Sequence, residues 1–146
     1  MSFSSLLAAS LLLTRSDAII AADRDGIIRF WNPGAERIFG YVRDDAIGRS
    51  LNLIIPQRLQ QRHWDGYRRT IESGKSRYGE GDLLSVPALH KNGTTISVEF
   101  TITPLTDESG AMIGMAAIMR DVTKRFEELR SLKRRLADSV KSSNGD

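Results

Sequence analysis

Apolar residues change their spacing along the chain, and this change predicts where helices and strands lie. Between residues 57 and 73, Leu59, His63 and Tyr67 recur four positions apart, as on one face of a helix. Between residues 95 and 105, apolar and polar side chains alternate, which is typical of a strand with one buried face. The first half therefore predicts short strands and helices, and the second half predicts mainly strands.

The predicted strands are joined by tight turns. Asn92-Gly93 predicts a hairpin turn of type I′, and Pro87 predicts an irregularity in the strand before it. Strands joined by tight turns run antiparallel, so the sequence predicts an α+β fold with helices on one face of an antiparallel sheet. The five predicted strands cover residues 18–22, 27–31, 76–89, 95–105 and 111–122.

Capping residues mark the predicted helices. Asn32 caps a helix that has Pro33 in its first position and ends at Gly40. Residues 43–48 predict one short helical turn, and Gly74 closes the helix over residues 57–73.

The sequence predicts a helix at each end of the chain, outside a central domain that we place at residues 17–122. Residues 1–16 form an amphipathic lead-in helix that Ser4 or Ser5 caps, and its apolar run is too short to span a membrane. Residues 123–146 hold a helix and tail, in which apolar residues follow a heptad with Lys133 at one seam position. We expect a homodimer through the two terminal helices; the alternative is a C-terminal helix folded back on its own domain.

Composition narrows the classes of function. The net charge of +3 does not require nucleic acid as a partner, and basic residues at 58–77 and 124–141 are typical of solvated helix faces. The absence of cysteine excludes disulfides, thiolate metal sites and thioether-linked cofactors, and it suits a cytoplasmic location. No phosphate-binding glycine loop or paired acid–base residues are present, so we expect no enzymatic activity.

Several sequence blocks in order resemble the PAS family. They are residues 17–20, 25–26, 31–41, 47–48, 91–94 and 120–123. The resemblance implies a five-stranded antiparallel sheet, and a sensory module that binds a ligand or cofactor and passes its state through the C-terminal helix to an effector. That effector would lie on a partner chain or on further sequence of a longer sensor.

The helix over residues 57–73 is similar to that of the PAS domains of bacterial oxygen sensors that bind b-type haem. Pro56 lies seven residues before His63, and Gly74 lies eleven residues after it, as around the proximal histidine of that group. The resemblance implies that His63 binds the haem iron and that Arg69 lies near the haem propionates. We expect the cofactor-binding set His63, Arg69, Arg77, Leu83, Ile96, Val98, Met115 and Met119.

The sequence also departs from that group. The distal arginine or methionine of those sensors falls here on Leu83 and Gly81, and Met115 or Met119 could serve as a sixth ligand or as part of the wall. Without cysteine, the photoreactive flavin type is excluded, whereas non-covalent flavin remains open. The alternative to haem is a cofactor-free module for a small metabolite or for protein dimerisation. The other histidine, His90, lies beside the Asn-Gly turn and is expected to be solvated.

Overall fold

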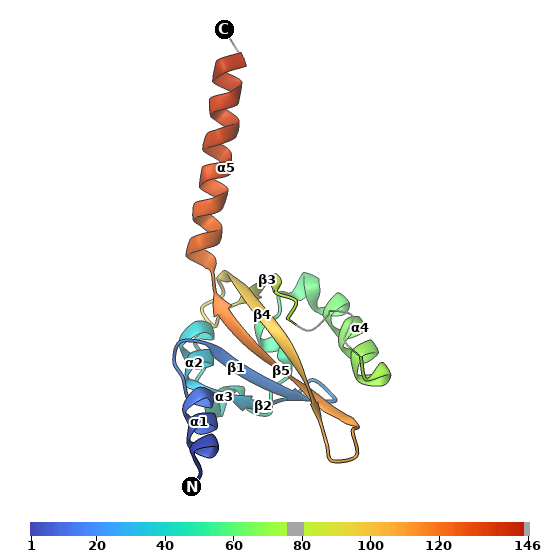
Figure 1. The fold of residues 1–146 in the computed structure, drawn as a ribbon. Helices are drawn as coiled ribbons and strands as arrows, with labels where there is room; N and C mark the ends of the chain where they lie inside the picture. The colour runs from blue at the N-terminus through green and yellow to red at the C-terminus, as the bar shows by residue number, and fades with distance from the viewer. Residues whose placement is uncertain (76–80, 145–146) are drawn as a thin grey trace.

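The computed structural model describes residues 1–75 and 81–144, and its centre is one five-stranded antiparallel sheet with strand order β2-β1-β5-β4-β3 (Figure 1). The strands are β1 (Ala18–Asp23), β2 (Ile28–Trp31), β3 (Leu84–Leu89), β4 (Thr95–Thr106) and β5 (Met112–Asp121). The helical elements are α1 (Phe3–Leu12), α2 (Pro33–Phe39), α3 (Arg43–Ala46), η1 (Leu51–Ile54), α4 (Gln57–Ser73) and α5 (Thr123–Asn144). The fold expected from the sequence is confirmed.

The turn between β3 and β4 is a hairpin, but its predicted type is wrong. A type I′ turn needs positive φ at both central residues, whereas only Gly93 has one, at +88°. The backbone N–H of Gly93 donates to His90 O, and His90 N–H donates to Thr94 O. The loop is therefore one residue longer than a type I′ turn, and the glycine supplies its left-handed position.

Strand β3 is shorter and more regular than predicted. It begins at Leu84, and residues 76–80 of the predicted strand lie outside the described residues. Pro87 pairs with Ser97 without a register shift, so the predicted irregularity is wrong. Because β3 is an edge strand, its proline can lie in a regular ladder at little cost.

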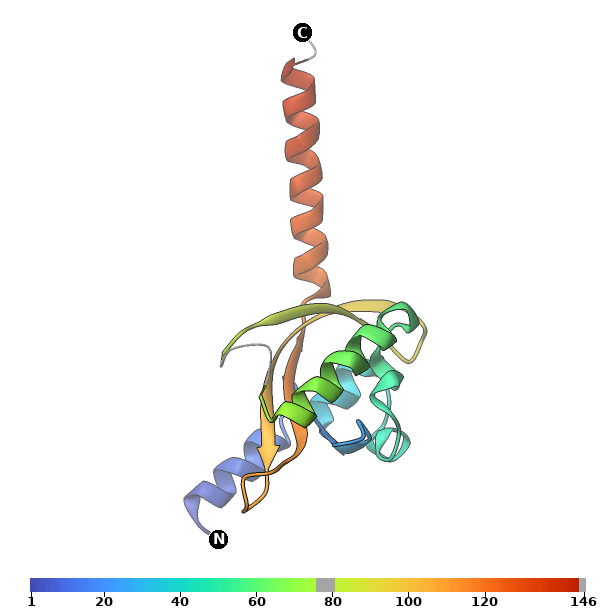
Figure 2. The ribbon, with the colours of Figure 1, turned by 90° about the vertical axis from the view of Figure 1, so that its right-hand side faces the viewer.

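The main core lies between the sheet and the helices that follow β2. Trp31, Phe39, Ile28 and Val98 are its largest fully buried apolar side chains. Helix α4 has a smaller cluster of its own, in which Tyr67, Ile71 and Met112 are buried. Figure 2 shows the curved sheet on one side and these helices on the other.

The two terminal helices bury no residue against the domain. The Oγ of Ser2 accepts a hydrogen bond from Ser5 N–H and caps α1, so the prediction that Ser4 or Ser5 caps it is wrong. Helix α5 projects away from the sheet instead of folding back on it (Figures 1 and 2). Within residues 1–75 and 81–144, no helix combines the length and the apolar character needed to cross a membrane.

Candidate functional site

The inner face of the sheet, which faces the helices, is incompletely covered over β3, β4 and the end of β5. Val98 is buried there, but Val86, its partner on the edge strand, is 39% exposed. Phe100 pairs with Met119 on the same face, and both are only partly buried. These apolar side chains leave a surface on which an apolar ligand could lie.

Helix α4 lies on the same side of the sheet, where it packs against Met112 and Met115 of β5, and it is fixed to the β1–β2 turn. The indole of Trp64 lies directly on Gly26, where an added Cβ would come within 2.1 Å of the ring. Its Nε1–H donates to Asn52 Oδ1 at 2.7 Å, and the hydroxyl of Tyr67 donates to the backbone oxygen of Asp23. These contacts set the rotation of α4 about its axis and hence the direction of its histidine.

His63 lies on α4 between two aromatic neighbours. Its ring centroid is 4.6 Å from that of Trp64 and 5.7 Å from that of Tyr67. The Nδ1 atom is buried and has no hydrogen-bond partner among the described residues. Burial lowers the pKa of His63 to about 4, so the imidazole is neutral at physiological pH. A buried polar nitrogen without a partner is uncommon and marks a candidate ligand site.

This environment fits a histidine that would hold a haem iron. Neutral imidazole is the form that binds iron, and haem needs only one such ligand from this helix. The described residues contain no cluster of three or more side chains that could hold a bare metal ion. The apolar inner face of the sheet suits the body of a porphyrin.

The other predicted site residues fall into two groups. Ile96 and Val98 are buried in the main core, Met119 packs against it, and Met115 packs against the α4 cluster. In contrast, Leu83 is 62% exposed, and Arg69 is exposed with its Nε–H donating to Asp65 O. Arg77 lies outside the described residues.

His90 differs from its prediction. It is partly buried instead of solvated, because its ring packs on Gly40, where an added Cβ would lie 2.7 Å from Cε1. Its Nδ1 accepts a hydrogen bond from Asn92 N–H at 3.0 Å. His90 is therefore held by local structure, unlike the unpartnered His63.

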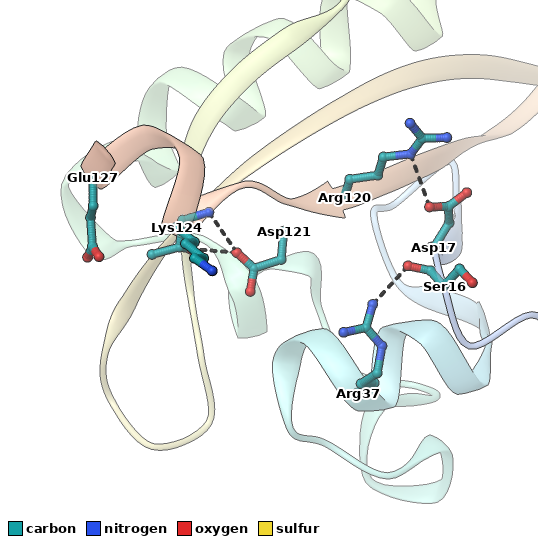
Figure 3. A pocket seen from close by; sticks show the side chains of 8 residues that line it. Ser16, Asp17, Arg37, Arg120, Asp121, Lys124 and Glu127 are labelled. Carbon is teal, nitrogen blue, oxygen red and sulfur yellow. Dashed lines mark hydrogen bonds and ion pairs between the residues drawn. The ribbon is translucent and has the colours of Figure 1, made fainter. Parts of the chain in front are cut away.

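A second feature, which the sequence did not indicate as a cleft, lies at the root of α5 (Figure 3). It is an open cleft of about 530 Å³ where the segment before β1, helix α2 and the end of β5 meet α5. Arg120 donates to Asp17 Oδ1 at 3.1 Å, and Arg37 donates to Ser16 O at 2.8 Å. The lining residues are Ser16, Asp17, Arg37, Arg120, Asp121, Thr123, Lys124 and Glu127. The cleft thus joins the segments that lead to the two terminal helices.

Burial of His63 predicts a pH dependence of stability. Between about pH 6.5 and pH 4, the unfolded chain binds a proton at this imidazole that the folded chain does not bind. The free energy of unfolding should therefore fall as the pH falls through this window, by about 2 kcal/mol after allowance for partial exposure. Urea unfolding near pH 7 and near pH 4.5 measures it.

The variant His63→Phe keeps an aromatic ring but cannot bind a proton. Carboxylates elsewhere titrate in both proteins, so the difference between the two pH dependences isolates His63. The wild type should lose more stability on acidification than the variant. Equal losses would contradict the neutral, buried state of the imidazole.

Comparison with known proteins identifies the family. A family model described as the PAS fold matches residues 14–127. The chain therefore belongs to the PAS family, which confirms the resemblance read from its sequence blocks. The PAS domain of a protein from Colwellia psychrerythraea superposes with a TM-score of 0.69 at 26% identity, over 84% of this chain and 99% of that one.

Two of the curated relatives are longer proteins named as sensors. The sensor protein FixL of Bradyrhizobium diazoefficiens is 30% identical over 128 residues, which cover 84% of this chain and 25% of FixL. The oxygen sensor protein DosP of Escherichia coli is 29% identical over 106 residues, covering 73% of this chain and 13% of DosP. The chain thus spans a quarter or less of these relatives, and it is a PAS sensory domain related to sensor proteins.

Proposed function

We propose that this chain is a haem-based sensory domain in which His63 binds the iron and α5 carries the signal outward. The observation that carries the proposal is the buried Nδ1 of a neutral imidazole without a hydrogen-bond partner, on a helix that faces an incompletely covered apolar sheet. The relationship to DosP, named an oxygen sensor, supports it. So does the spacing of Pro56 and Gly74 around His63.

Each residue of the site has a distinct part in this proposal. A bound haem would supply an iron centre that responds to a gas or to redox state. His63 would hold the iron, and Ile96, Val98, Met115 and Met119 would form apolar walls. Arg69 would neutralise a carboxylate of the porphyrin, since guanidinium and carboxylate pair well.

The strand β5 provides a short route from this site to α5. Met115 and Met119 lie on its inner face, and the strand ends at Asp121, two residues before the helix begins. Asp121 Oδ1 accepts hydrogen bonds from the backbone N–H and the hydroxyl of Thr123. Thr123 Oγ1 in turn accepts from Ser97 N–H on β4 at 2.9 Å. A shift of β5 would therefore change the direction of α5.

Titration of the purified protein with haem tests the proposal. Wild type should bind about one equivalent and develop the Soret band of histidine-ligated haem. His63→Ala should lose that band because alanine cannot bind iron. His90→Ala is the matched control, since His90 is the only other histidine, and it should behave as wild type. Failure of wild type to bind, or an unchanged spectrum in His63→Ala, would contradict haem ligation by His63.

The exposed apolar residues favour one second candidate. Val86, on the inner face at the sheet edge, remains 39% exposed, which suits an apolar small molecule bound without iron. In that case the haem titration gives no Soret band. Denaturing mass spectrometry of the protein as purified should then detect a retained organic compound.

A further inference from the structure

Helix α5 carries an apolar stripe that no other described residue buries. Its members are between 48% and 67% exposed: Phe126, Leu129, Leu132, Leu136 and Val140. Most of the stability of a helix in a protein comes from packing of its apolar face. The stripe therefore needs a partner, and the heptad spacing indicates another helix.

The charged side chains at the seam and flank positions of the heptad are all positive. Lys133 occupies a seam position, and Arg125 and Arg130 flank the seam on its two sides. The guanidinium of Arg130 lies 5.8 Å from the centre of the Phe126 ring, which places it along the stripe. The acidic residues of α5 fall at heptad positions turned away from the seam: Glu127, Glu128 and Asp138. None of the ion pairs between described residues includes a residue of α5.

These charges disfavour pairing of α5 with a copy of itself. In a parallel pair, Lys133 would face its own copy, and Arg125 would face Arg130 of the second helix. In an antiparallel pair, each flank of α5 would face the same flank of the second helix. The charged residues of the two flanks, Arg125 and Arg130, are both positive, so like charges would meet again. The seam is only about two and a half heptads long. Its apolar contacts therefore add little free energy of association to offset this repulsion.

We propose that α5 docks on a helix of a different protein or domain whose apolar stripe is flanked by glutamate or aspartate. Such a helix covers the leucines and pairs each basic flank residue with a carboxylate. Electrostatic complementarity of this kind selects partners and register in helix pairs. A nucleic acid is the poorer occupant, because phosphate contacts would leave the exposed leucine stripe in water.

A fluorescent three-heptad peptide with leucine at its seam and glutamate at its flanks tests the proposal against the full chain. A second peptide has the same seam and lysine at the flanks. By fluorescence anisotropy, the acidic peptide should bind about tenfold more tightly than the basic one, the size expected of a few exposed ion pairs. The difference should shrink in high salt, which screens exposed charges.

Two triple variants separate the seam from general charge. Arg125→Glu, Arg130→Glu and Lys133→Glu together should weaken binding of the acidic peptide by about tenfold. Lys124→Glu, Arg134→Glu and Arg135→Glu change the net charge equally but lie away from the seam, and they should leave the affinity within about twofold. Since α5 buries no residue, both variants should keep the thermal unfolding transition of the PAS domain.

Three results would overturn the proposal. One is equal affinity for the two peptides, or equal weakening by both triple variants. Another is self-association through α5. In sedimentation equilibrium it would appear as a dimer that forms at a lower protein concentration than peptide binding requires. This dimer would dissociate in the double variant Leu129→Ser, Leu136→Ser. The third is displacement of the acidic peptide by a single-stranded RNA or duplex DNA of about 20 nucleotides. This nucleic acid would also bind the double-serine variant as tightly as it binds wild type.

Discussion

Replacing Asn32 with alanine should lower the free energy of unfolding by about 3 kcal/mol. Asn32 is only 1% exposed, and its side chain makes four hydrogen bonds. Its Oδ1 accepts from the N–H groups of Ile19 and Ala35, and its Nδ2 donates to the carbonyl oxygens of Thr14 and Asp17. Alanine would leave the two N–H groups and the carbonyl of Asp17 without these partners, whereas the Thr14 oxygen keeps its hydrogen bond from Gly34 N–H. Polar groups that lose their partners in the interior carry the full cost of desolvation.

Urea unfolding followed by circular dichroism measures this loss. Asn32→Asp is an informative companion, because aspartate can still accept from both N–H groups but at neutral pH cannot donate to either carbonyl. It should be destabilised near neutral pH and recover in part on acidification, when the protonated carboxyl can donate. A loss below about 1 kcal/mol in Asn32→Ala would show that the asparagine acts only as a helix cap.

Gly34→Ala is expected to have an effect of similar size through a steric conflict. Gly34 lies in α2, and an added Cβ would come within 1.8 Å of the backbone oxygen of Asp17. Because the conflict is with backbone, no side-chain rotation relieves it, and α2 must move away from the start of β1. We expect a loss of about 3 kcal/mol, at the upper end for overpacking. Thermal and urea unfolding measure the change.

Gly66→Ala provides the matched control for this variant. Gly66 also lies in a helix, α4. An added Cβ there would meet open space, with no atom within 4 Å apart from the neighbouring helix backbone, and the φ of Gly66 is not positive. Alanine there should raise stability by about 0.5–1 kcal/mol through helix propensity. Comparable destabilisation by the two variants would show that loss of glycine itself, and not the contact with Asp17, is responsible.

The parts of the fold that depend on local chemistry were predicted well. Helix α4 has the predicted bounds, and α2 begins after Asn32 and ends at Gly40 as expected, because capping and turn residues act on their immediate neighbours. Three local predictions were wrong: the capping serine of α1, the irregularity at Pro87 and the type of the Asn-Gly turn. At that turn, the same dipeptide suits two loop lengths, and the register of β3 and β4 decides between them.

The features that depend on distant contacts were missed or only partly predicted. The sequence indicated Asn32 as a cap, but its bonds to Thr14, Asp17 and Ile19 arise only when β1 lies beside α2. His63 was selected by its spacing from Pro56 and Gly74, whereas its unpartnered Nδ1 depends on the packing of α4. Exposure of Leu83 could not be foreseen, because alternation in a predicted strand does not reveal where the strand begins.

Strand β5 connects the domain to α5, so its place in the sheet affects how the domain could move this helix. This strand is the middle one of five and is hydrogen-bonded on both sides, to β1 and to β4. Its amide protons should exchange with solvent among the slowest in the protein, since leaving the ladder requires two neighbours to open. Residues 114–119 of the strand are thus held from both sides, whereas Arg120 and Asp121, next to α5, pair with β4 alone. A shift of β5 or a tilt of the sheet would swing the far end of the helix over a lever about 33 Å long.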